Sequence, residues 1–214
     1  AVSRRFRMAR PLPSCAAALR AALLEGDVDP TKLCEGGMEF YRLIDSLGSF
    51  AKPVAQQASG NLEKIRNGAA ALGEGTSMRK LLQLERDSGM HRGTELKDPS
   101  AAMGALWIVR FLAFWEEVCL ARINPDESIP FKETLEDAYK HNLQDFSGGM
   151  SHMSFHGALL AVPPWKEVRA KLGPPGQETF QEDVFAWIDV SQEVGNLLMK
   201  MIREYGMEDK RKSI

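Results

Sequence analysis

Three polar residues in the first third of the chain have the spacing of a shared helix face. On a helix at about 100° per residue, Gln57, Asn61 and Lys64 fall within an arc of about 60° and project together. An uncharged amide pair beside an amine can donate and accept hydrogen bonds to a polar, neutral ligand. A solvated helix face is the competing interpretation, and spacing alone favours it.

Residues that could support catalysis or hold a metal are sparse. His152 and His156 lie four residues apart on one helix face, but no carboxylate is placed to complete a metal site. We interpret them as a surface or groove-lining pair and expect neither a metal nor a cofactor. The chain has no Walker loop, no H-E-x-x-H motif, no nucleophile elbow and no G-x-G-x-x-G loop after a strand. These absences argue against an enzyme.

The composition is that of an ordinary globular domain. The chain has 214 residues, of which 44% are hydrophobic and 26% are charged. We expect a basic, flexible segment over residues 1–12, either solvated or touching anionic lipid, and one domain over 13–214. A net charge of −2 gives no basic field for nucleic acid. Three cysteines without a C-x-x-C pair suit a reducing compartment, and we expect a cytoplasmic protein without a transmembrane helix.

Periodicity predicts an all-α protein. Helical spacing dominates, two-residue alternation is nearly absent, and Gly and Pro supply the breaks. The segment from Ala101 to Leu120 is apolar almost all the way round, so other helices must wrap it. It is interrupted mainly by Arg110, Glu116 and Glu117, and Asp98 before Pro99 is placed to cap the helix. Trp107 in this segment is either core packing or a flat wall on which a sugar can stack. We predict helices over 14–25, 31–48, 51–72, 77–89, 99–122, 131–147, 150–161, 165–172 and 179–205.

Several segments in order resemble the glycolipid transfer protein family. The similarity covers about residues 30–205. The matching residues are Phe40–Gly48, Pro53, Ser59–Ile65, Ala105–Leu112, Ala138–Tyr139, Leu143, Phe146–Gly148 and Ala158–Pro163. The resemblance implies a two-layer helical sandwich, with about eight helices around a central tryptophan-bearing helix. It also implies a protein that shelters one sphingolipid-like molecule, a glycolipid, and moves it between membranes, and we expect it to be a monomer. The headgroup would lie in a polar surface site, and the ceramide chains in an apolar pocket.

The resemblance also assigns roles to individual residues. Asn61 and Lys64 stand where the family contacts the headgroup, and Trp107 stands where glycolipid-selective members stack the first sugar. Members selective for phosphorylated ceramide have arginines at the positions of Met103 and Trp107, so a phosphate clamp is not expected. We assign the acyl-chain pocket to Val54, Met103 and Phe111.

Two headgroup positions depart from the family pattern. Gln57 replaces an aspartate that anchors the sugar and the ceramide amide, and Ser147 replaces a histidine that donates to the amide carbonyl. Together these changes are expected to weaken binding of the usual ligand by about 2–4 kcal/mol. Headgroup specificity is therefore expected to be altered.

Membrane contact is the other point at which the chain departs from the family. The tryptophan with which the family settles on membranes is here Gly149. Trp165, just after Pro163 and Pro164, is either a substitute anchor or a half-buried packing residue. The alternative function is a lipid sensor or interaction module that keeps the fold but does not transfer.

Overall fold

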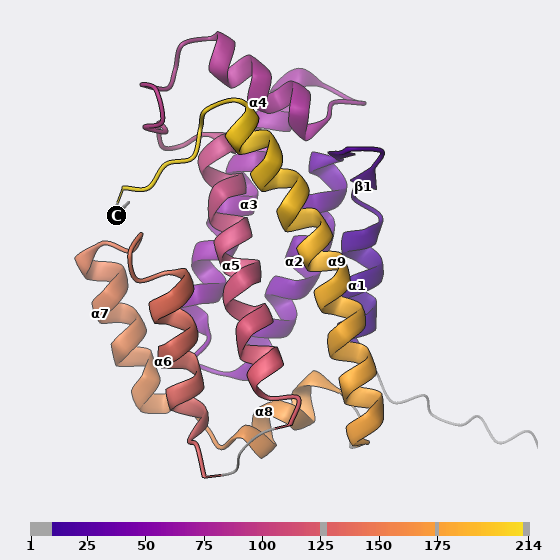
Figure 1. The fold of residues 1–214 in the computed structure, drawn as a ribbon, viewed down its shortest axis with the longest axis vertical. Coiled ribbons are helices and arrows are strands. Elements are labelled where there is room, and N and C mark those ends of the chain that lie inside the picture. The colour runs from indigo at the N-terminus through magenta and orange to yellow at the C-terminus, as the bar shows by residue number, and fades with distance from the viewer. Residues whose placement is uncertain (1–9, 125–127, 174–175, 212–214) are drawn as a thin grey trace, which may run out of the picture.

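Helices make up most of the part of the chain that the structure describes (Figure 1). The computed structural model describes residues 10–124, 128–173 and 176–211. The predicted all-α class is confirmed. The helices are α1 (Pro11–Arg20), α2 (Pro30–Leu47), α3 (Lys52–Leu72), α4 (Met78–Asp87), α5 (Ala101–Ala121), α6 (Phe131–Asn142), α7 (Gly149–Ala158), α8 (Trp165–Leu172) and α9 (Gln177–Glu204), and a 3₁₀ turn, η1 (Leu159–Ala161), follows α7.

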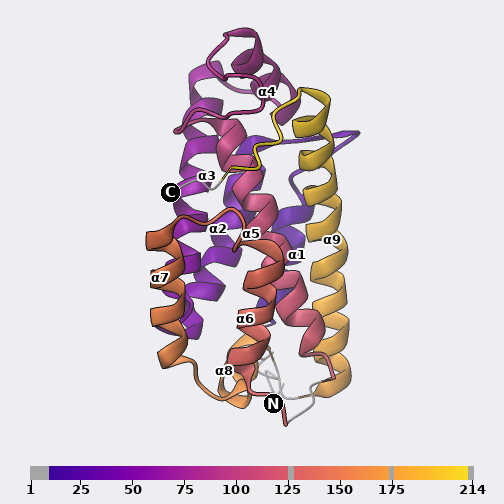
Figure 2. The ribbon, with the colours of Figure 1, turned by 60° about the vertical axis from the view of Figure 1, so that its left-hand side comes forward.

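The long helices form two layers, as the resemblance implies. In one layer α2 packs between α1 and α3, and in the other α5 packs between α6 and α9 (Figures 1 and 2). The layers meet where α3 lies against α5 and where α1 lies against α9. The short helix α7 packs on α3, while α4 and α8 lie at opposite ends of the bundle. None of the described helices is both long and apolar enough to cross a bilayer.

The central helix is α5, because its side chains are apolar on every side and need neighbours all round. Ser100 caps its N-terminus by accepting from the Met103 N–H at 3.1 Å. At Gly104 the backbones of α3 and α5 approach so closely that a Cβ would lie 2.5 Å from the Asn61 carbonyl oxygen. This glycine allows the polar face of α3 to lie directly against α5.

Two predicted helices are too long at their C-terminal ends. The first ends at Arg20 rather than at residue 25, and strands β1 (Leu23–Leu24) and β2 (Asp27–Val28) form a hairpin whose turn contains Gly26 at φ 70°. The sixth ends at Asn142 rather than at residue 147, and a turn follows in which the Ser147 N–H donates to the Leu143 carbonyl. In both places the backbone forms the hydrogen bonds of a hairpin or a turn instead of continuing the helix.

Two further expectations concern the starts of α5 and of the described chain. Asp98 does not cap α5, because Ser100 does so and the Asp98 carboxylate instead meets Lys64. The expected flexible segment falls mainly on residues 1–9, which lie outside the described residues. Arg10 is described, and its guanidinium forms an ion pair with the buried Asp183 carboxylate of α9.

Candidate functional site

Two of the three polar residues that share a face of α3, Gln57 and Asn61, lie beside Trp107 of α5 rather than on a solvated face. Asn61 is only 4% exposed, and its Nδ2 donates to the Gln57 carbonyl oxygen at 2.8 Å. The Asn61 Oδ1 is buried and has no hydrogen-bond partner among the described residues. Gln57 is half-buried one turn earlier. A buried acceptor without a partner is costly to the fold, so this oxygen is a candidate for contact with a bound donor.

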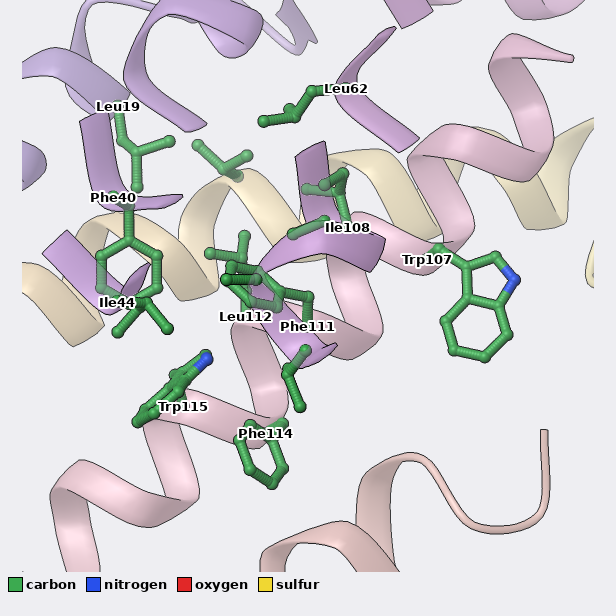
Figure 3. Close-up of a cluster of buried hydrophobic side chains, with 14 of the residues drawn as sticks. Leu19, Phe40, Ile44, Leu62, Trp107, Ile108, Phe111, Leu112, Phe114 and Trp115 are labelled. Carbon is green, nitrogen blue, oxygen red and sulfur yellow. The ribbon is translucent and has the colours of Figure 1, made fainter. Parts of the chain in front are cut away.

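A narrow cleft beside Trp107 brings α3, α5 and the turn after α6 together. Trp107 is 5% exposed, and in Figure 3 its ring lies apart from the cluster around Phe40, Ile44 and Trp115. The cleft has no room for a water molecule. Its walls are Val54, Gln57, Ala58, Asn61, Trp107, Phe111 and Leu143. The indole is therefore part of the buried core, and the side chains next to it along this seam between helices are both polar and apolar.

A second cavity adjoins this cleft and shares Val54, Gln57 and Leu143 with it. Its volume is about 150 Å³, and it lies between α3, α6 and α7. Ser147 is buried on its wall and donates from Oγ to the Leu143 carbonyl at 2.9 Å, while burial raises the pKa of the neighbouring Tyr139 hydroxyl. The described residues that line these two cavities are all uncharged. Such walls suit hydroxyl and amide groups rather than ions.

Lys64 lies one turn beyond Asn61, outside the walls of the cleft. Its Nζ is 2.6 Å from Oδ1 of Asp98, and the two side chains are 23% and 27% exposed. The Lys64 Cβ is 3.2 Å from where a Cβ on Gly104 would lie. The amine that the sequence predicted for the site is therefore present, but a carboxylate from another segment neutralises it.

Arg110 is a site neighbour that sequence reasoning did not assign. Its guanidinium carbon lies 5.0 Å from the Trp107 ring centroid and 3.6 Å from that of Phe146. Burial lowers the pKa of Arg110 to about 10, so the group stays charged at neutral pH. Its Nη2 donates to the Asp209 carbonyl oxygen at 2.6 Å. Arg110 therefore backs the indole and links α5 to the C-terminal segment.

The C-terminal segment is held beside the site by Asp209. One carboxylate oxygen, Oδ2, accepts from the Leu96 N–H at 2.8 Å and from Arg211 Nη2 at 2.6 Å. Burial alone would raise the pKa of this carboxyl, but hydrogen bonds from the Arg211 side chain and from the Arg211 and Leu96 backbone N–H groups lower it to about 2. The ionised Asp209 is therefore part of the folded structure at neutral pH.

The low pKa of Asp209 predicts a pH-dependent contribution to stability. Because the folded pKa lies below the unfolded value of about 3.9, the stabilisation is complete above that value and is lost as pH falls toward 2. Asp209→Asn is expected to lower the free energy of unfolding by about 2 kcal/mol at pH 6. Urea unfolding at pH 6, 4 and 3 should show this difference shrinking, whereas a constant difference would contradict the assignment.

Comparison with known proteins decides the family. The family model described as glycolipid transfer protein (GLTP) matches residues 28–174, more than half of the chain. The chain belongs to the glycolipid transfer protein family. No curated protein sequence matches the chain.

Solved structures of the glycolipid transfer protein fold superpose along most of the chain. Mouse ceramide-1-phosphate transfer protein is 15% identical, with a TM-score of 0.81, and the match covers 93% of this chain and 98% of that one. The FAPP2 structure, whose printed subject is selection of simple glycosphingolipids, is 18% identical, with a TM-score of 0.79 and coverages of 95% and 99%. The fungal protein HET-C2 is 22% identical, with a TM-score of 0.73 and coverages of 86% and 92%. Identities this low establish the shared fold.

The headgroup residues that the glycolipid transfer protein resemblance assigns occupy three places in this structure. Gln57, Asn61 and Trp107 line the narrow cleft together. Ser147 lines the adjoining cavity, and Gln57 lines that cavity as well. Lys64 lies beyond the cleft and is paired with Asp98. Gln57, Asn61 and Trp107 therefore meet where α3 faces α5, Ser147 lies on the side of α6 and α7, and no single cavity contains all five residues.

The three residues expected to line the acyl-chain pocket do not all lie in one cavity either. Val54 and Phe111 line the cleft beside Trp107. Met103 is buried in α5 but is not among the cleft walls. Two of the three residues therefore line the cleft, and their assignment to an acyl-chain pocket stays a prediction.

Trp165 is half-buried at the start of α8, where its ring lies 5.1 Å from that of Phe131 and 6.1 Å from that of Phe180. The most exposed large apolar side chains lie elsewhere, on α7 and η1: Met150 is 78% exposed, Met153 is 68% exposed and Leu160 is 86% exposed. Sequence reasoning missed these residues. The available signal was a stretch from 146 to 165 without any Asp, Glu, Lys or Arg.

The histidine pair forms as its spacing predicted, with ring centroids of His152 and His156 4.3 Å apart. The Tyr139 hydroxyl lies 3.4 Å from Nδ1 of His152. Within the described part of the chain, no group of three or more His, Cys, Asp or Glu side chains could hold a metal ion.

Proposed function

We propose that this chain binds one sphingolipid and carries it between membranes without changing it chemically. The observation that carries the proposal is the cleft in which Trp107, Asn61 and Gln57 meet, in a member of the glycolipid transfer protein family. The matched structures bear the names of ceramide-1-phosphate transfer protein, of FAPP2 with simple glycosphingolipids and of a fungal glycolipid transfer protein. These names support a sphingolipid as the ligand class.

The chemistry of the cleft suits a headgroup that carries hydroxyls. The buried Oδ1 of Asn61 requires a donor, which a sugar hydroxyl supplies. The Trp107 ring offers a flat apolar face against which a sugar can stack. Gln57 and Ser147 supply neutral hydrogen-bonding groups in place of a carboxylate and an imidazole, so each contact is weaker than its charged counterpart. We therefore propose altered headgroup specificity, with the site still built for a polar, neutral group.

The lipid chains would follow the apolar side of the same cleft. Val54, Phe111 and Leu143 continue its walls away from the polar face of α3. The cleft in this structure is narrower than a water molecule, so a hydrocarbon chain fits only when the helices around it move apart. Burial of apolar chain surface at about 25 cal/mol per Å² provides the driving force for that movement.

We place membrane contact on α7 and η1 rather than on Trp165 alone. Met150, Met153 and Leu160 project into solvent from this segment, and α7 also forms a wall of the second cavity. An exposed apolar cluster beside a binding cavity suits transient insertion among lipid headgroups. The buried free thiols Cys15, Cys34 and Cys119 fit a cytoplasmic protein, and we propose that it acts as a monomer.

The proposal is tested by moving a fluorescent galactosylceramide between phosphatidylcholine vesicles. The purified chain is expected to accelerate transfer, and Gln57→Asp combined with Ser147→His is expected to increase the rate by about tenfold or more, because charge-assisted bonds replace neutral ones. The exposed pair Glu63→Gln with Arg66→Gln on α3 serves as the control. Absence of transfer for every sphingolipid in a broad panel would refute the proposal.

A second candidate function is a lipid sensor that binds but does not release its ligand. Gly149, at the position of the family's membrane-seating tryptophan, favours it. Mass spectrometry of lipid extracted from the purified protein distinguishes the two, because a sensor would contain bound lipid and yet give no transfer between vesicles.

A further inference from the structure

We infer that Asp98 is a specificity-determining residue that makes the headgroup site select an uncharged, hydroxyl-bearing headgroup and reject a phosphorylated one. The inference rests on the proposed function, because it concerns which sphingolipid headgroup the site accepts. It starts from the ion pair of Lys64 with Asp98, whose oppositely charged atoms are 2.6 Å apart. Both side chains are about three-quarters shielded from solvent, so water screens the pair less than it screens an exposed one.

The pair lies one helical turn beyond Asn61, next to the cleft but outside its walls. Lys64 follows Asn61 by one turn of α3, and its Cβ lies against the Gly104 position of α5. Gly104 precedes Trp107 by one turn of α5. The ion pair is therefore the next polar feature beyond the buried amide and the indole. A headgroup that touches both would have the pair as its neighbour.

The segment that bears Asp98 is anchored from outside the site. Two residues before it, the Leu96 N–H donates to Asp209 Oδ2 at 2.8 Å, and Arg211 Nη2 donates to the Leu96 carbonyl at 3.2 Å. Asp209 is itself fixed by Arg110, whose Nη2 reaches its carbonyl oxygen. These hydrogen bonds hold the loop before α5 against the C-terminal segment. The backbone next to Asp98 is therefore fixed while its carboxylate pairs with Lys64.

Three of the cations near the cleft already have partners that a phosphate would have to displace. Arg211 pairs with Asp209 at 2.6 Å and with Glu95 at 3.3 Å. Arg110 is buried between two aromatic rings and donates to a backbone carbonyl. Lys64, one turn beyond Asn61 on α3, is already paired with the Asp98 carboxylate.

A phosphate monoester would bring nearly two negative charges up to the Asp98 carboxylate, and like charges this close oppose binding. A sugar brings none. Its hydroxyls can donate to the Asp98 carboxylate and accept from the Lys64 ammonium without breaking the pair. Residue 57 carries an amide in this chain. The carboxylate next to the headgroup site therefore comes from Asp98, on a different segment of the chain.

The test measures transfer of two fluorescent probes, galactosylceramide and ceramide-1-phosphate, between phosphatidylcholine vesicles. The wild type is expected to favour galactosylceramide. Asp98→Asn preserves the shape of the side chain and is expected to shift the ratio of the two rates toward ceramide-1-phosphate by at least about tenfold. Asp98→Asn with Lys64→Gln is expected to lose that gain, because the amine set free by the first change is removed by the second.

Asp137→Asn is the matched control, since Asp137 forms an exposed pair with Lys140 on α6 at 3.0 Å. Its ratio should equal that of the wild type, and circular dichroism should show all variants equally folded. An unchanged ratio in Asp98→Asn, or a wild type that prefers ceramide-1-phosphate, would overturn the inference while leaving sphingolipid transfer intact. A wild type that moves neither probe nor any other sphingolipid would overturn both.

Discussion

Trp107→Ala is expected to abolish lipid transfer and to lower the free energy of unfolding by about 3–5 kcal/mol. The side chain is 5% exposed, packs against the Arg110 guanidinium and walls the cleft. Its removal leaves a cavity at the interface of α3 with α5 and takes away the flat surface next to Asn61. Transfer of fluorescent galactosylceramide and urea unfolding measure the two losses.

A more conservative pair of variants separates the loss of function from the loss of stability. Trp107→Phe and Trp187→Phe each exchange a buried indole for a smaller ring, but Trp187 stacks on Phe40 at 4.5 Å on the α9 side of the core. We expect comparable destabilisation in both and a fall in transfer of about tenfold only in the first. Equal transfer by the two variants would mean that the indole at 107 contributes packing and nothing to the ligand.

Gly104→Ala is expected to lower the free energy of unfolding by about 3 kcal/mol, although it adds one methyl group. That methyl would lie 2.5 Å from the Asn61 carbonyl oxygen and 3.1 Å from Cγ1 of Ile65, so two helix backbones must move apart. Because the displaced segment of α3 also carries Lys64, transfer should fall as well. Urea unfolding and the vesicle assay provide the measurements.

Gly60→Ala is the matched control, because it makes the same substitution on α3 where a Cβ would meet nothing within 4 Å. There the methyl group should raise the free energy of unfolding by about 0.5–1 kcal/mol through helix propensity alone. If both glycines responded with the same sign, the close approach at Gly104 would not be what constrains the α3–α5 interface.

The helices could be predicted from the sequence because hydrophobic periodicity and Gly or Pro breaks are local properties. Residues that share a helix turn, such as Gln57 and Asn61, were also placed together correctly. The hairpin around Gly26 was missed, because a short apolar run before a glycine looks the same whether it ends a helix or forms a two-residue strand.

Most of what surrounds the candidate site could not be predicted, because it depends on contacts between distant segments. Asp98 was expected to cap a helix, yet it meets Lys64, a residue 34 positions earlier in the chain. Arg110 was read only as an interruption of an apolar helix, since nothing local indicates that Phe146 and Asp209 would surround it. Such pairings are set by how the layers stack, which spacing along one helix does not encode.

The narrowness of the slot beside Trp107 also affects how strongly hydrocarbon length should count. In a preformed, rigid tunnel each added methylene would contribute about 0.8 kcal/mol of transfer free energy. Here the same methylene fits only if α3 and α5 move further apart. The free-energy cost of that movement offsets part of the gain from burying the methylene. Affinity should consequently rise with tail length along a shallow slope that flattens once the layers resist. Because the separated helices relax when the lipid leaves, this strain would favour release of the lipid into the bilayer.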